Sequence, residues 1–172
     1  VAEVAELARA ICAGAAVARL SLRGNLITGS DPSWKSNREF DKDLSGLISL
    51  CDALLTLKNP IELDLSECGL SVNGVNPVAK AISAGATVAR LSLKGNFPCD
   101  RISKDGDGMA PWLPGKNFTS WISLCESFEQ STTLTEIDVS ECYLGPEALT
   151  PLAKAIQAMA IASLNISGNF IF

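Results

Sequence analysis

Apolar and polar residues alternate in five short segments of the chain, each built around two leucine-like residues two positions apart. The first apolar residues of these segments are Leu20, Leu63, Leu91, Ile137 and Leu164. Alternation of this kind is typical of a half-buried β-strand. Between the segments, "LARAI" at 7–11, "VAKAI" at 78–82 and "LAKAI" at 152–156 place apolar residues four positions apart. This spacing predicts helices with one apolar face, so each unit is expected to be a strand, a turn and a helix.

The five units fall into two alternating classes. The first, third and fifth segments end in Gly-Asn, as in "ARLSLRGN" at 18–25 and "ARLSLKGN" at 89–96. The second and fourth end in Glu-Cys, as in "IELDLSEC" at 61–68. Successive segments are 43, 28, 46 and 27 positions apart. Self-similarity of this kind indicates a repeat architecture, and the element that repeats is a pair of units.

Two dipeptides mark the positions where helices are expected to begin. Asn76-Pro77 and Thr150-Pro151 precede two of the apolar stretches and hold equivalent places in their units. An oxygen-bearing side chain is a preferred helix cap, and a proline in the first helical turn removes no hydrogen bond. We therefore expect helices to start at the two prolines.

The alternation of Leu-x-Leu-x-x-Asn with Leu-x-Leu-x-x-Cys-x-Leu, in units near 28 residues, resembles the ribonuclease-inhibitor type of leucine-rich repeat. It departs from that pattern at Ala148, where Gly74 would repeat, and at Pro60, where other units have an apolar residue. The resemblance implies an α/β fold, a curved solenoid or horseshoe with parallel strands on its concave side and helices on its convex side.

The resemblance covers residues 1–172 as a single leucine-rich repeat domain of about five strand units, with loop insertions near 27–45 and 97–119. An open solenoid end exposes apolar surface. We therefore expect the domain to be part of a longer chain or assembly, with further repeats or complex subunits covering its ends.

The asparagine that ends each Asn-class segment is expected to bond backbone groups where the chain leaves the strand. Cysteine takes this place in the other class as a small buried residue with a weak donor. Four cysteines fall at repeat-equivalent positions: Cys51, Cys68, Cys125 and Cys142. No pair has the spacing of a zinc site, so we expect reduced thiols in an intracellular, cytoplasmic protein. Cys12 and Cys99 fall outside the pattern. Cys99 is the one to test for thiol reactivity, with a structural or incidental role as the favoured alternative.

Residues that flank the strand leucines are expected to face the concave, solvent side of the sheet. The column before the first leucine-like residue is Arg19, Glu62, Arg90, Glu136 and Ser163. Adjacent strands lie about 4.8 Å apart, so this column places opposite charges side by side. Such exposed pairs contribute about 0.2 to 1 kcal/mol each, and a self-neutralised ladder is the simpler interpretation. The alternative is a partner-binding face, with candidate residues Arg19, Arg23, Asp64, Lys94 and Asp138.

The two insertions follow a strand and precede a helix, on the same rim of the expected solenoid. Each is rich in turn-forming residues and holds one tryptophan, Trp34 or Trp112. Because they are two units apart, we expect them to stand next to each other, and long loops on repeat scaffolds often carry binding. Trp34 and Trp112 are therefore candidate partner-binding residues. The alternative is that each tryptophan packs on its own rim.

The sequence offers little for catalysis. No histidine occurs in the chain, which removes the usual general base and the Ser-His and Cys-His nucleophiles. "SKDGDG" at 103–108 lacks the acidic first and twelfth positions of an EF-hand, so Asp105 and Asp107 indicate a solvated turn, with a weak cation site as the alternative. A net charge of −5 argues against nucleic acid, and no apolar stretch reaches the length that spans a bilayer. We expect no enzyme activity, no cofactor and no membrane insertion.

Two function classes remain. The first is a non-catalytic protein–protein interaction module, a scaffold that binds a protein partner through the concave sheet, the paired rim insertions or both. The second is a structural subunit packed permanently into a larger multiprotein complex. The resemblance also admits an inhibitor or a ligand-sensing domain, although no nucleotide-binding segment supports the latter.

Overall fold

A computed structural model describes residues 1–30, 40–103 and 112–171 of the chain. Its elements, in chain order, are α1 (Ala2–Cys12), β1 (Arg19–Ser21), α2 (Ser45–Leu54), β2 (Ile61–Asp64), α3 (Val75–Ser83), β3 (Val88–Ser92), β4 (Arg101–Ser103), β5 (Trp112–Pro114), α4 (Thr119–Gln130), β6 (Glu136–Asp138), the 3-10 helix η1 (Pro146–Ala148), α5 (Leu149–Ala158) and β7 (Ser163–Asn165). Strands and helices alternate as expected, and the antiparallel pair β4–β5 is added within the second insertion.

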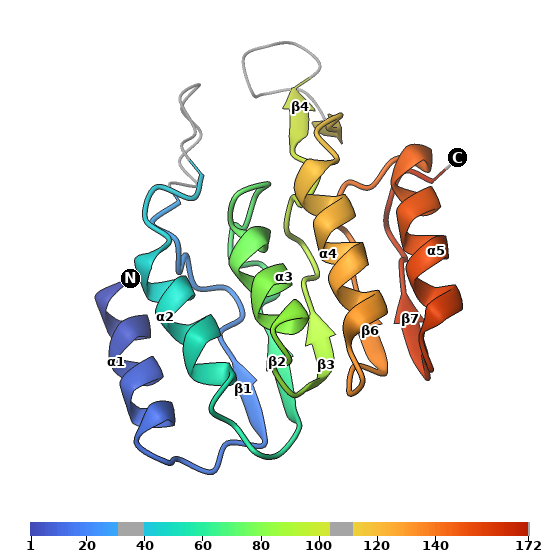
Figure 1. The fold of residues 1–172 in the computed structure, drawn as a ribbon. Helices are drawn as coiled ribbons and strands as arrows, with labels where there is room; N and C mark the ends of the chain where they lie inside the picture. Colours follow the sequence, from blue (N-terminus) through green and yellow to red (C-terminus); the bar gives the residue numbers. More distant parts are fainter. Residues whose placement is uncertain (31–39, 104–111, 172) are drawn as a thin grey trace.

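Five strands form one parallel sheet in the order β1-β2-β3-β6-β7, which is also their order along the chain. The marker residues of the five segments lie beside one another in this sheet: Leu20, Leu63, Leu91, Ile137 and Leu164. The predicted alignment of the repeats is therefore confirmed. Figure 1 shows the helices side by side along the sheet, with the N and C termini at opposite ends of the row.

The core lies between the sheet and the row of helices. The inward side chains of the central strands are buried, as are the helix residues opposite them: Leu63, Leu91, Ile137, Leu47, Leu50, Val78, Ile82 and Leu124. Burial of such a side chain contributes about 1.5 to 3 kcal/mol, which must offset an ordering cost of similar size per residue. Stability therefore requires several units to stack, because one strand–helix unit cannot bury both of its apolar faces.

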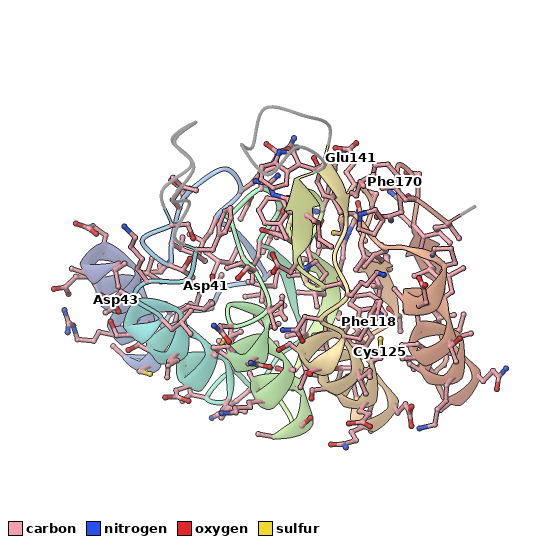
Figure 2. The ribbon with its side chains drawn as sticks, turned by 90° about the horizontal axis from the view of Figure 1, so that it is seen from above. Asp41, Asp43, Phe118, Cys125, Glu141 and Phe170 are labelled. Atoms are coloured by element: carbon pink, nitrogen blue, oxygen red, sulfur yellow. The ribbon has the colours of Figure 1, made fainter. Side chains whose placement is uncertain are left out.

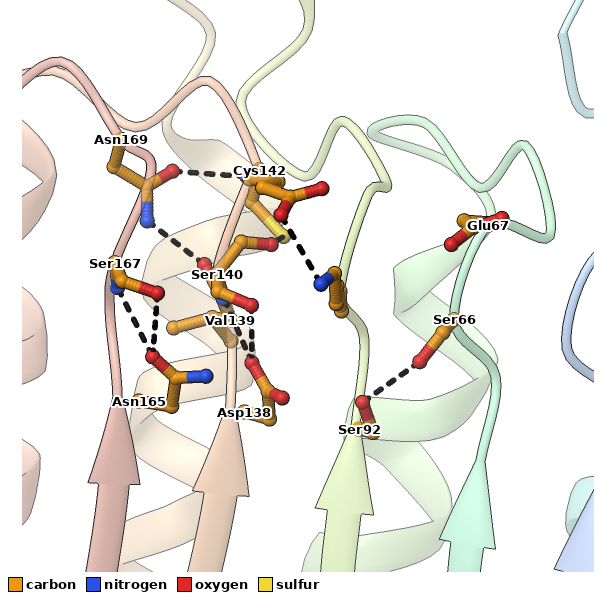
Figure 3. A network of polar contacts seen from close by, with 12 residues as sticks. Ser66, Glu67, Ser92, Asp138, Val139, Ser140, Cys142, Asn165, Ser167 and Asn169 are labelled. Atoms are coloured by element: carbon orange, nitrogen blue, oxygen red, sulfur yellow. Dashed lines mark hydrogen bonds and ion pairs between the residues drawn. The ribbon is translucent and has the colours of Figure 1, made fainter.

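Buried asparagine side chains tie neighbouring strands together where the chain leaves the sheet. Asn96 Nδ2 donates to the carbonyl oxygens of Leu65 and Leu93, both at 2.8 Å, and its Oδ1 accepts the backbone N–H of Leu70 at 2.9 Å. Asn169 forms the equivalent set of bonds one pair of units later, which Figure 3 shows in part. The predicted backbone-binding role of this asparagine is confirmed at both positions.

Cysteine occupies the same place in the other class of unit. The Sγ atoms of Cys68 and Cys142 donate to the carbonyl oxygens of Leu22 and Leu93, at 3.1 and 3.2 Å. Each acceptor belongs to the strand unit before the cysteine, and both cysteines are buried. Asn and Cys therefore alternate in one hydrogen-bonded row, which we call the exit ladder: Asn25, Cys68, Asn96, Cys142 and Asn169.

Helices α3 and α5 begin before the predicted prolines. They start at Val75 and Leu149, so Pro77 and Pro151 occupy the third helical position. The predicted helix starts are therefore wrong by two residues. The first four N–H groups of a helix have no partner within it, so a proline at the third position removes no hydrogen bond either.

A carboxylate from the first insertion caps α3. Asp41 Oδ2 accepts the backbone N–H groups of Ser71 and Gly74, at 3.1 and 2.7 Å, and the Ser71 hydroxyl at 2.6 Å. A Cβ atom on Gly74 would lie 2.5 Å from Asp41 Oδ1, so glycine is required for this close approach. The first insertion thus takes over the capping role that we had expected of Asn76.

We expect the loss of a buried asparagine of the exit ladder to lower the free energy of unfolding more than the loss of an exposed one. In Asn96→Ala, the buried Leu70 N–H and Leu65 carbonyl lose their partner, and unfolding free energy should fall by about 2 to 4 kcal/mol. Asn25→Ala is the matched control, because Asn25 is exposed and, among the described residues, its side chain bonds only to the carbonyls of Leu22 and Arg23 in its own unit. Its effect should stay within about 0.5 kcal/mol. Urea denaturation measures both, and equal losses would contradict the assignment.

Candidate functional site

The sheet face opposite the helices carries a groove of charged and hydroxyl side chains. It is lined by Arg19, Ser21, Arg23, Glu62, Leu63, Asp64, Ser66, Arg90, Ser92, Lys94 and Asp138. The structure therefore brings the five charged residues that the sequence nominated for partner binding into one surface. They come from β1, β2, β3, β6 and the residues directly after them.

Opposite charges pair across the strands of this face. Arg19 Nε lies 2.7 Å from Glu62, and an Arg90 guanidinium nitrogen lies 3.5 Å from Glu136. The backbone register places Glu62 between Arg19 and Arg90. The predicted column of alternating charge is therefore confirmed.

A second row of ion pairs lies where the strands end. Arg23 pairs with Glu67 at 2.6 Å and Lys94 pairs with Glu141 at 3.0 Å. Both glutamates have a left-handed backbone, with φ of 57° and 56°. Strand alternation alone does not predict these acids, because the alternation breaks at this turn. The signal was present, since the triplet Ser-Glu-Cys occurs at 66–68 and again at 140–142.

The two aspartates of the face are held by hydroxyl and backbone donors. Asp64 accepts the Ser66 N–H at 3.0 Å and the Ser21 hydroxyl at 2.9 Å. Partial burial raises the pKa of Asp64, but these bonds and the nearby Arg23 charge outweigh it and hold the pKa below its ordinary value. Asp138 accepts the N–H and hydroxyl of Ser140, at 3.0 and 2.6 Å (Figure 3). All five nominated charges thus have partners within the chain, which favours the self-neutralised ladder.

A row of aromatic rings runs along the rim at which the strands end. Successive ring centres of Phe40, Phe97, Tyr143 and Phe170 lie 5.3, 5.8 and 5.9 Å apart. Figure 2 looks onto this rim and shows Phe170 close to Glu141. Three of the rings directly follow the Asn or Cys of the exit ladder, in "NF", "CY" and "NF". The row was not predicted, although three of its residues hold the same position in their repeat units.

The side chain of Arg101 covers the aromatic row. Its guanidinium carbon lies 3.8 Å from the ring centre of Phe97, 4.2 Å from that of Trp112, and 5.5 Å from those of Phe40 and Tyr143. Such cation–π contacts contribute about 0.5 to 2 kcal/mol. Phe40 belongs to the first insertion and Arg101 to the second, so the predicted contact between the insertions is confirmed.

The structure describes one of the two nominated tryptophans. Trp112 lies in β5 and is half-buried against Arg101 of β4. This agrees with the alternative interpretation, in which the tryptophan packs on its own rim. Trp34 lies outside the described residues, as do Asp105 and Asp107.

Apolar side chains are exposed on the β4–β5 pair and at the end of the aromatic row. Ile102 and Leu113 face each other across the β4–β5 pair and are 47% and 40% exposed, and Phe170 is 37% exposed. A hollow along the aromatic row is lined by Glu67, Gly95, Phe97, Arg101, Glu141, Tyr143, Gly168 and Phe170. We call the following residues the rim patch: Phe40, Phe97, Arg101, Ile102, Leu113, Tyr143 and Phe170.

The buried thiols are poor nucleophiles. Burial raises the pKa values of Cys51, Cys68, Cys99 and Cys142 to about 12, and burial also raises the pKa of Cys125. Cys99 is fully buried, so its nomination as the reactive thiol is wrong. All six cysteines are free, and Cys12 is exposed.

No helix among the described residues is both long and apolar enough to cross a membrane.

The arrangement of helices and strands is similar to that of a solved domain. The tropomodulin C-terminal domain from Caenorhabditis elegans matches with a TM-score of 0.59 and 14% identity, over 96% of this chain and 83% of that one. No family model and no curated protein matches the sequence. At this identity the likeness shows the fold alone, which is a leucine-rich-repeat-like α/β fold.

This likeness corrects the resemblance to the ribonuclease-inhibitor type of repeat. The matching domain has a leucine-rich-repeat-like fold but is not of that type. The sequence motif was too general to make the distinction. Leu-x-Leu followed by Asn or Cys indicates a buried strand whose end is held by a side-chain hydrogen bond to the backbone. Related repeat folds share this requirement.

We expect a single fast-reacting thiol in the native protein. At about pH 8 a thiol whose pKa is raised by burial stays protonated, and only the thiolate attacks a disulfide reagent. A thiol-exchange assay with a chromogenic disulfide should therefore detect Cys12 alone, and Cys12→Ser should abolish the fast phase. Cys99→Ser should leave that phase unchanged. A fast phase that disappears in Cys99→Ser would contradict the burial of Cys99.

Proposed function

We propose that the chain is a non-catalytic protein–protein interaction module that binds a partner through the rim patch. The observation that carries the proposal is the exposure of three apolar side chains, Ile102 and Leu113 on the two strands that hold Arg101 and Trp112, and Phe170 at the end of the aromatic row. Aromatic and arginine side chains dominate the binding energy of protein interfaces. The leucine-rich-repeat-like fold supports this role by holding the patch on a rigid support, which we propose to be a curved solenoid.

The rim patch is a better candidate than the groove on the sheet face. In the groove the nominated charges already have partners, and a new partner would have to replace them. Replacing one exposed ion pair by another contributes little binding free energy. At the rim, apolar side chains lie in solvent, and covering them releases about 25 cal/mol for each Å² of apolar surface.

The described side chains support a role without catalysis. The chain has no histidine, and the raised pKa of Cys51, Cys68, Cys99 and Cys142, about 12 in each case, keeps these thiols protonated at neutral pH. Asp64, whose pKa is lowered, is a weak base held by serine donors. A general base should titrate near the working pH and face a substrate, and none of these groups does.

A structural subunit of a larger complex is the second candidate. A groove between α2 and α3 is lined by Leu44, Ile48, Leu55, Pro77 and Ala81 among others. Ile48 and Leu55 are 45% and 43% exposed, which is the observation that favours permanent packing at this face. A constitutive subunit should aggregate alone, whereas an interaction module should be a soluble monomer.

A comparative pull-down with the 172-residue chain tests the proposal. We expect Ile102→Asp with Leu113→Asp to reduce the captured partner by about tenfold or more, because charges at a desolvated interface centre cost at least 1 to 2 kcal/mol. Ile48→Asp with Leu55→Asp, of similar exposure on the helix face, is the matched control and should capture normally. Loss of the partner in the helix-face variant alone would favour the structural-subunit alternative and contradict the rim.

A further inference from the structure

The groove between α2 and α3 has one bulky wall and one shallow wall. The two helices lie side by side in the row of Figure 1, and the groove has a volume of about 440 Å³. Its apolar lining comes from the helices and their caps: Leu44, Ile48, Leu55, Pro77, Ala81 and Ala84. On the α2 side, Ile48 and Leu55 project into solvent and are 45% and 43% exposed. The α3 side contributes small side chains, which leave the space open.

The groove also carries one charge of each sign. Asp52 of α2 and Lys80 of α3 both line it and are exposed. Neither forms an ion pair with another described residue. Each charge lies eleven residues before a strand leucine, and these leucines, Leu63 and Leu91, are partners in the sheet. The two charges therefore lie at the same level of their helices.

The next pair of helices repeats this pattern but satisfies its cation within the chain. "ISLC" at 48–51 recurs at 122–125 in α4, and "AKAI" at 79–82 recurs at 153–156 in α5. Leu55 therefore corresponds to Glu129, and Lys80 corresponds to Lys154. Glu129 and Lys154 form an ion pair of 3.1 Å. Between α2 and α3, the leucine in place of the glutamate leaves the cation without this acid and adds apolar surface.

The walls of the groove favour helices as the elements that cover it. Backbone groups inside α2 and α3 are bonded within each helix. An extended segment would therefore find no main-chain partners along the walls. A helix satisfies its own backbone and packs side chain against side chain. The groove is thus suited to a second helical surface with bulky and small residues in complementary places.

From these features we infer that the α2–α3 groove is a self-association site, covered by the same groove of a second copy of this chain. The helices α2 and α3 run in the same direction, because both connect parallel strands. A two-fold axis parallel to them brings α2 of each copy onto α3 of the other at the same level. Asp52 then faces Lys80 of the second copy, and symmetry repeats this pair. The bulky wall of each copy lies against the shallow wall of the other.

Charge selects this arrangement over the other two-fold contact. With the axis perpendicular to the helices, α2 would face α2 and α3 would face α3. Aspartate would then approach aspartate and lysine would approach lysine. Like charges that face each other in an interface oppose association, whereas the parallel arrangement makes both contacts attractive.

The contact is weak by design of its size. Two helices of each copy cover a small area, and small interfaces are transient. The dilute chain therefore stays the soluble monomer expected of an interaction module, and two copies associate when the chain is concentrated. The groove shares no residue with the rim patch, so the inference stands apart from the proposed function. It also accounts for exposed Ile48 and Leu55 without a second kind of subunit.

Sedimentation equilibrium of the 172-residue chain, from about 10 µM to 1 mM, tests the inference. We expect the average mass to rise with concentration towards that of a dimer. Leu55→Glu places the acid of the second helix pair beside Lys80, and it should weaken self-association by about tenfold or more. Ile122→Glu is the matched control, because Ile122 is 41% exposed on α4, and it should associate normally.

An exchange of charges between copies tests the predicted pair of residues. Asp52→Lys sets a lysine against Lys80 of the second copy, and Lys80→Glu sets a glutamate against Asp52. Each variant alone should self-associate about tenfold more weakly. An equimolar mixture of the two variants should associate as strongly as the unchanged chain. The reason is that both contacts in the mixed dimer join a lysine to an acid.

Three results would overturn the inference. The first is an unchanged chain that stays a monomer at the highest concentration, and the second is equal loss in Leu55→Glu and Ile122→Glu. The third is a mixture that associates no better than its two components. Urea denaturation of each variant verifies that it is folded.

The rim proposal is tested separately. The rim variant Ile102→Asp with Leu113→Asp should self-associate normally, and Leu55→Glu should still capture the rim partner. Failure of the groove and failure of the rim patch are therefore distinguished.

Discussion

The structure depends on hydrogen bonds that each unit makes to the unit before it at the point where its strand ends. A parallel strand of three to five residues forms too few ladder bonds to fix its own register, and a slip of one residue would turn every buried leucine to the opposite face. Buried Asn96 and Asn169 prevent this slip, because their amides satisfy backbone groups on two units at once. Cys68 and Cys142 each make one weak bond to the unit before them at the same place.

This constraint separates the surfaces that are used in folding from those that are free to bind. The strand face is occupied by cross-strand ion pairs that follow the register, and its net charge is low. The rim lies beyond the ladder, where no register has to be kept, and the insertions are accommodated there. Phe40 and Arg101 come from the two insertions and complete an aromatic row begun by the repeat residues Phe97, Tyr143 and Phe170.

The sequence predicts those features that recur with the repeat. Strand positions, their order in the sheet and the role of Asn96 follow from identical segments, because the same physical requirement selects the same residues in each unit. The contacts of Asp41 and Arg101 could not be predicted. Each residue belongs to an insertion and contacts residues outside that insertion's repeat pattern, so no periodicity indicates its partners. The buried state of Cys99 failed for the same reason. The helix starts failed although their dipeptides recur, because a proline costs no hydrogen bond anywhere in the first helical turn. The type of leucine-rich repeat failed because the motif is shared.

Native-state amide hydrogen exchange tests the role of the exit ladder most directly. The account predicts that the Leu70 N–H and the Asn96 side-chain N–H groups exchange only as slowly as the central strand amide of Leu63, through global unfolding. The Asn25 side chain, which is exposed and bonds only carbonyls of its own unit among the described residues, should exchange fast. Exchange of the Asn96 and Leu70 protons at the rate of Asn25 would contradict the account, because the ladder would then open without the sheet.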